Sequence, residues 1–139
     1  MKDLEKLQNW LKTYPYWTDD LQVDFLEAAP GNAGLYPEGM ELRSRQVDVL
    51  GNQQVSCRYR FTVYRQVPGQ DSSPEEAQWL LDFQDWVQRQ SAAGLAPCFG
   101  DLPQEEWLRA QKGTLKKSGQ TKVYAVTLIA DFVRQYTLA

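Results

Sequence analysis

Residues 54–67 read QVSCRYRFTVYRQV, and apolar and polar residues alternate along the whole stretch. A period of two predicts a strand that is buried on one face only. The apolar face carries Val55, Cys57, Tyr59, Phe61 and Val63. The polar face carries Ser56, Arg58, Arg60, Thr62 and Tyr64. Two arginines therefore share one face of the strand that decides the fold.

The segment before this strand, residues 41–50, adds two more arginines, Arg43 and Arg45. Between the two segments, LGNQ predicts a two-residue type II′ turn with Gly51 in its first position. Such a hairpin places Arg45 opposite Arg58 and Arg43 opposite Arg60, unless a one-residue bulge breaks the register. Like charges directly opposite one another are unfavourable, so this face calls for a negatively charged partner.

The remaining elements follow from apolar spacing. Helices are predicted over residues 2–13 and 74–92, the second with a capping box of Ser73 and Glu76. Strands are predicted over 21–27, 41–50, 53–67, 107–117 and 121–136, with a Pro- and Gly-rich loop over 29–39. The order indicates a single α+β domain over residues 1–139. We expect a mainly antiparallel sheet of about five strands with two helices packed on one face.

Composition excludes several classes of function. The chain has 139 residues, a net charge of −3 and no histidine, which removes the commonest general base and metal ligand. Cys57 and Cys98 lack motif spacing and are expected to be free thiols. No phosphate-binding loop, secretory signal or membrane span is evident. We therefore expect an intracellular protein with no enzymatic activity, no metal and no cofactor.

The predicted last strand, KVYAVTLIADFVRQY, is apolar on both faces. A strand of this kind needs cover on both sides. Two helices cover one side, and either the loops 29–39 and 95–105 or another subunit covers the other. One face of this strand is thus a candidate subunit interface, either the face of Val126, Leu128 and Phe132 or that of Val123, Ile129 and Val133.

The four arginines leave three alternatives for their partner: acidic residues of the same chain, carboxylates of a neighbouring subunit, or a phosphate backbone. The acidic net charge argues against DNA contact without excluding it. We expect Arg43, Arg45, Arg58 and Arg60 to form an interface with an adjacent subunit. Its helix 74–92 offers four acidic residues, namely Glu75, Glu76, Asp82 and Asp85.

Four segments carry a resemblance to a known family. They are residues 11–39, which read LKTYPYWTDDLQVDFLEAAPGNAGLYPEG, and the later stretches CRYRFTVYRQ, FQDWVQRQSAAGLAPCFGD and GTLKKSGQTKVYAVTLIADFVRQY. Together they resemble the short minor capsid or minor tail proteins of Firmicutes prophages. These are similar to tail terminator and head–tail joining proteins of long-tailed phages. The resemblance implies a structural subunit of the virion, assembled in the bacterial cytoplasm. It implies a homo-oligomeric ring, for which a hexamer is one expected size. It also implies other tail or connector proteins as partners. The alternative is a small intracellular protein-binding module without catalytic activity.

Overall fold

The computed structural model describes residues 2–15, 21–23, 33–68, 74–111, 113–118 and 121–137. Its elements are α1 (Asp3–Leu11), β1 (Leu21–Val23), β2 (Ala33–Val47), β3 (Gln53–Pro68), α2 (Pro74–Ala92), a 3₁₀ turn (Pro103–Glu105), β4 (Trp107–Ala110), β5 (Thr114–Ser118) and β6 (Thr121–Tyr136). The α+β class is confirmed, with six strands in place of about five. Both expected helices are present, while Ser73 of the expected capping box lies outside the described residues.

The strands form one sheet in the order β1-β2-β3-β6-β4, and β5 also pairs with β6. Only the short β1–β2 pairing is parallel, and the others are antiparallel. β3 and β6 pair over their whole length, from Gln53 opposite Tyr136 to Pro68 opposite Thr121. β6 thus has β3 on one edge and β4 and β5 on the other, so it is a central strand of the sheet.

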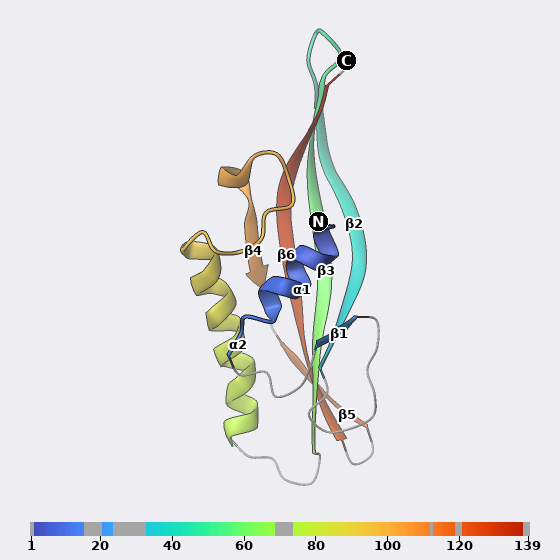
Figure 1. The fold of residues 1–139 in the computed structure, drawn as a ribbon. Helices are drawn as coiled ribbons and strands as arrows, with labels where there is room; N and C mark the ends of the chain where they lie inside the picture. The colour runs from blue at the N-terminus through green and yellow to red at the C-terminus, as the bar shows by residue number, and fades with distance from the viewer. Residues whose placement is uncertain are drawn as a thin grey trace.

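Both helices lie on the same side of the sheet (Figure 1). We call this side the core face; it carries Val55, Cys57, Phe61 and Val63 of β3, all buried. α2 places Trp79, Phe83 and Val87 in the same core. α1 packs beside α2 through stacked rings of Trp10 and Trp86, whose centroids are 4.7 Å apart. The wide aromatic stripe of α2 is therefore shared between the sheet and α1.

The β2 strand begins earlier than the sequence indicated. Residues 29–39 were expected to form a loop, yet the strand begins at Ala33 and contains both Pro37 and Gly39. The pairing with β3 shifts between these two residues and shifts again between Leu42 and Ser44. Pro and Gly are tolerated here because a bulge relaxes the ladder and because β2 has β3 as its only long neighbour.

The expected strand 107–117 is divided into β4 and β5. Both pair with the same edge of β6, and the pairing changes register between Ala110 opposite Leu128 and Thr114 opposite Ala125. The break lies where the chain passes under α2, since a Cβ built on Gly113 would be only 2.4 Å from Leu80 Cδ1. The chain thus passes close to α2 at Gly113, which lies between β4 and β5.

The hairpin turn also differs from the expected two-residue turn. Val47 pairs with Gln53, so five residues connect the strands. The Asp48 carboxylate accepts hydrogen bonds from the backbone N–H groups of Leu50 and Asn52, both 2.9 Å long. Gly51 has a φ of 86°, which favours glycine. Asp48 organises this loop from inside, as Asx turns do.

Beyond the helices, three strands continue as a narrow projection (Figure 1). We call it the arm: residues 42–56 of the β2–β3 hairpin together with residues 133–136 of β6. Neither α1 nor α2 reaches its tip (Figure 1). None of the described helices is long and apolar enough to cross a membrane. Cys57 is a buried free thiol and Cys98 an exposed one.

Candidate interaction surfaces

The arginines of the hairpin do not face one another. Arg58 lies opposite Glu41 on one side and Asp131 on the other. Arg45 lies opposite Val55, and Arg43 falls in the bulge between Leu42 and Ser44. The expected register was wrong because the loop has five residues and because β2 carries two bulges. Arg58 and Arg60 are on the outer face of the sheet, whereas Arg45 shares the core face with Val55.

Asp131 is the centre of an ion-pair cluster on the outer face. Its carboxylate accepts hydrogen bonds from Arg58 Nε at 2.7 Å and from Arg58 Nη2 at 3.2 Å. Arg109 Nη1 of β4 donates a third at 2.8 Å. The cluster thus links three neighbouring strands, β3, β6 and β4, through one carboxylate.

The environment lowers the pKa of Asp131 below its ordinary value. Burial acts in the opposite direction, since it disfavours the charged carboxylate, but the hydrogen bonds and positive charges of Arg58 and Arg109 outweigh it. The Asp131 side chain is 29% exposed, and those of Arg58 and Arg109 are 15% and 18% exposed. Partial burial of all three makes this cluster a fixed part of the fold, in contrast to a solvated surface pair.

A second, more exposed pair joins Arg60 to Glu41, with Arg60 Nε 2.9 Å from Glu41 Oε1. The outer-face arginines therefore meet carboxylates of their own chain, which is the alternative that the sequence left open beside a neighbouring subunit. On α2, Asp82 and Asp85 are exposed, and Asp85 pairs with Arg89. The side chains of Glu75 and Glu76 lie outside the described part.

The three apolar residues expected at a subunit interface lie in the core. Val126, Leu128 and Phe132 point to the core face and are almost completely buried. On the opposite face of β6, Ile129 and Val133 are buried as well. Val123 of that face is half-buried. Apart from Val123, the residues of β6 expected at an interface are therefore buried within their own chain.

The arm provides an exposed surface. On its core face, past the helices, lies a groove of about 700 Å³. We call it the arm groove; its lining residues are Leu42, Arg43, Ser44, Arg45, Gln53, Val55 and Tyr136. Leu42 is 68% exposed and Tyr136 about half exposed, whereas Val55, where the arm meets the core, is buried. The face that forms the protein core in the body thus continues onto the arm without a covering helix.

The charges of this groove are all positive. Arg45 Nε donates a hydrogen bond to the Gln53 side chain at 2.9 Å. Within the described residues, neither Arg43 nor Arg45 forms an ion pair with a carboxylate. The arm groove therefore combines apolar surface with two guanidinium groups that lack a counter-charge among those residues.

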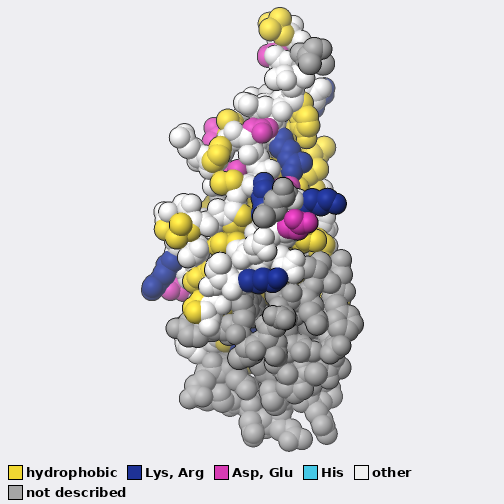
Figure 2. Space-filling view, viewed as in Figure 1, with side chains coloured by type: hydrophobic (Ala, Val, Ile, Leu, Met, Phe, Trp, Pro, Cys, Tyr) yellow, Lys and Arg dark blue, Asp and Glu magenta, His cyan; other side chains and the backbone are white. Residues whose placement is uncertain are grey.

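The tip of the arm is apolar too. Val49 and Leu50 are the most exposed large hydrophobic residues of the described chain, and Val47 below them is half exposed. Figure 2 shows hydrophobic side chains at the tip of the narrow projection. Water-exposed apolar side chains gathered on one projecting element are typical of a protein contact site.

The arm is joined to the body by a hydrogen-bonded junction. Tyr59 Oη donates to Asp3 Oδ2 of α1 at 2.6 Å. Arg134 Nη2 of β6 lies 2.6 Å from the same carboxylate oxygen and 2.9 Å from Tyr59 Oη. Burial and the adjacent Asp3 carboxylate together raise the pKa of Tyr59, so the phenol stays protonated as a donor. α1 is thus anchored where the arm begins.

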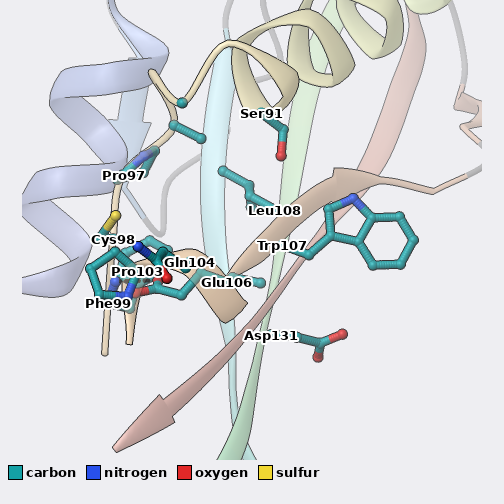
Figure 3. A pocket seen from close by; sticks show the side chains of 13 residues that line it. Ser91, Pro97, Cys98, Phe99, Pro103, Gln104, Glu106, Trp107, Leu108 and Asp131 are labelled. Atoms are coloured by element: carbon teal, nitrogen blue, oxygen red, sulfur yellow. Dashed lines mark hydrogen bonds between the residues drawn. The ribbon is translucent and has the colours of Figure 1, made fainter. Parts of the chain in front are cut away.

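A smaller pocket of about 220 Å³ lies between the end of α2, the loop that follows it and β4 (Figure 3). The Glu106 carboxylate accepts the backbone N–H groups of Phe99 and Gly100, so it serves to hold the loop. The Trp107 ring points away from Phe99 and lies 4.2 Å from the Arg109 guanidinium. Cys98 and Glu106 both line the pocket, and burial together with the Glu106 carboxylate raises the pKa of the Cys98 thiol.

Among the described residues, no three His, Cys, Asp or Glu side chains are close enough together to hold a metal ion. No protein-family model matches this sequence, and no curated protein matches it. The arm and the outer-face cluster are therefore interpreted from their own geometry.

Sequence reasoning missed the partners of the arginines. Asp131 is the only charged residue within the apolar run TLIADFV of the last strand. A lone carboxylate in a strand otherwise apolar on both faces signals a nearby cation. Trp107 and Arg109, at the start of the expected strand 107–117, carried no comparable signal.

Proposed function

We propose that this chain is a structural subunit of a phage or prophage virion that takes part in a tail terminator or head–tail connector ring. The observation that carries the proposal is the arm. It extends a sheet beyond the helices that complete the core and presents apolar side chains to water. The resemblance to prophage minor capsid and minor tail proteins supports the same role.

An exposed apolar arm stabilises an isolated chain little and an assembled one more. Leu42, Val49 and Leu50 lie on a projecting hairpin, where they contribute little to the stability of the isolated chain. Burying one large aliphatic side chain completely is worth roughly 1.5–3 kcal/mol. A projecting apolar element therefore contributes most when another protein covers it, as it would in an assembled ring.

The chemistry of the chain agrees with a non-enzymatic role. Histidine is absent from the sequence, and the outer-face arginines are occupied by Glu41 and Asp131. In the described pocket, burial and the nearby Glu106 carboxylate raise the pKa of the Cys98 thiol, which disfavours the thiolate that a nucleophile would need. The partners proposed are other copies of the chain and neighbouring tail or connector proteins, in the virion and during its assembly in the bacterial cytoplasm.

A second candidate function is a small intracellular protein-binding module. It is favoured by the burial of both faces of β6 within one chain and by the intramolecular pairing of Arg58 and Arg60. Because these apolar faces and charges are satisfied within one chain, the chain can act as a monomer that binds one partner through its arm.

The test is to replace both tip residues, Val49→Ser with Leu50→Ser, in the phage or prophage that encodes the chain. Because the two side chains are exposed, the purified variant should unfold at the wild-type temperature. We expect it to be missing from purified particles, and native mass spectrometry should show loss of its complex with neighbouring tail or connector gene products.

A matched control is Leu95→Ser, since Leu95 is similarly exposed but lies after α2, away from the arm. This control should be incorporated normally. If the wild-type chain itself is absent from purified particles and binds a non-virion protein, the binding module replaces the virion role.

A further inference from the structure

We infer that the arm groove binds the exposed side of α2 from a second copy of this chain. The inference rests on the proposed function and names the contact through which neighbouring subunits would join. It follows from three features of the described residues: an uncovered part of the core face, a positive charge on it, and an acidic helix elsewhere on the surface.

The first feature is the kind of element that the groove accepts. Leu42, Val55 and Tyr136 point to the same face as the core residues of β3 and β6, as their register shows. In the body, this face is covered by helices that place apolar side chains on it. A third helix laid on the arm would extend the same packing, which is the helix-in-groove mode of recognition.

The second feature is charge. Arg43 and Arg45 line the groove, and none of its described lining residues carries a carboxylate. No ion pair within the described residues neutralises the two guanidinium groups. A helix that binds here should therefore carry acidic side chains beside an apolar one. Charge complementarity of this kind fixes the orientation of a contact more than its strength.

The third feature is the exposed side of α2. Leu81, Asp85, Gln88 and Ala92 are all exposed and lie at helical spacing, so they form one stripe. Asp82 lies beside Leu81, is also exposed, and forms no ion pair among the described residues. Asp85 pairs with Arg89 of the same helix, so Asp82 is the acidic group of this side without an ion pair among the described residues. The stripe and Asp82 together place an apolar side chain beside acidic ones, as the groove requires.

The two surfaces are far apart on one copy, since the arm projects beyond α2 (Figure 1). They therefore pair between copies and not within one. A contact that joins two different surfaces is head-to-tail, and its repetition produces a closed ring or an open filament. This is the geometry that a ring subunit needs.

The test uses the purified full chain in sedimentation velocity and native mass spectrometry. Wild-type protein should form species larger than a dimer as its concentration rises to about 1 mM, the weak end of specific association. The variant Arg43→Glu with Arg45→Glu should stay monomeric, with an unchanged melting temperature. The control Lys2→Glu with Lys12→Glu changes the net charge equally at two exposed sites of the N-terminal region and should assemble like wild type.

A charge exchange then identifies the partner surface. The variant Asp82→Lys with Asp85→Lys should also fail to assemble alone. Mixed with the arginine variant, it should restore species larger than a dimer, because every junction then joins opposite charges. A mixture that stops at the dimer, or a wild-type assembly unaffected by either variant, would overturn the contact.

The outcomes separate the contact from the proposed function. A wild-type chain that stays monomeric up to about 1 mM refutes self-association through the arm groove. Incorporation into purified particles is measured independently and decides the virion role on its own.

Discussion

The substitution Asp131→Asn should destabilise the protein more than any other single charge removal on the outer face. Asparagine keeps the shape of the side chain but removes the negative charge that faces Arg58 and Arg109. The carboxylate accepts three hydrogen bonds from these arginines. Its loss leaves two guanidinium groups in a partly buried site without a counter-charge.

The magnitude lies between two limits. Hydrogen bonds to charged groups contribute about 1.5–3 kcal/mol each, whereas exposed ion pairs contribute about 0–1 kcal/mol. Because the Asp131 side chain is 29% exposed, we expect a loss of about 2 kcal/mol in the free energy of unfolding for Asp131→Asn. For a chain of this length, that corresponds to a fall in melting temperature of roughly 7 °C.

The assay is chemical and thermal unfolding followed by circular dichroism, with Glu41→Gln as the matched control. Glu41 pairs with Arg60 on the same face, but its side chain is 51% exposed, so this control should lose less than about 1 kcal/mol. The reasoning is refuted if both variants lose the same stability, or if Asp131→Asn loses less than about 0.5 kcal/mol.

Three further predictions concern pH, backbone fit and the base of the arm. Since the folded pKa of Asp131 is depressed, its stabilisation should be complete above the unfolded pKa of about 3.9. The stability gap between wild type and Asp131→Asn should then shrink in unfolding titrations as the pH falls below that value. Gly100→Ala should destabilise the protein by about 2 kcal/mol or more, because its Cβ would lie 2.3 Å from a backbone oxygen of β6. Gly94→Ala, with a φ of 72° but open space around it, should cost only about 1 kcal/mol in the same thermal unfolding. Tyr59→Phe removes the hydrogen bond to Asp3 and should speed amide hydrogen exchange in α1 with a loss of about 1 kcal/mol; unchanged exchange would show that the phenol does not anchor the helix.

The elements with a clear period were predictable from the sequence. The helix over 74–92 matches α2, and the alternation of 54–67 identified both faces of β3. The register in which these strands pair was harder to predict from the sequence, because it depends on loop length and on bulges that leave no periodic signal. Asp48 caps a five-residue loop that the LGNQ pattern concealed, and the resulting shift moved Arg45 to the core face.

The candidate interface residues were also predictable only in part. All four arginines were expected to meet carboxylates, and among the described residues this holds for Arg58 and Arg60. That Asp131 is the partner of Arg58 required the β3–β6 register. The apolar residues Val126, Leu128 and Phe132 were expected at an interface because β6 was taken to have too little cover. In the structure these residues lie in the same core as the two helices, and the sequence alone does not say which face of β6 the helices cover.

The central position of β6 also governs how the chain reaches its native state. β6 is synthesised after the five other strands, yet β3, β4 and β5 all pair with it. β3 in particular finds its partner only across α2 and the loops that follow it. Until β6 emerges from the ribosome, the long β2–β3 hairpin has an unpaired edge along β3. Such non-local pairing is typical of folding in milliseconds to seconds, and a nascent chain in this condition is a substrate for chaperones and a risk for aggregation.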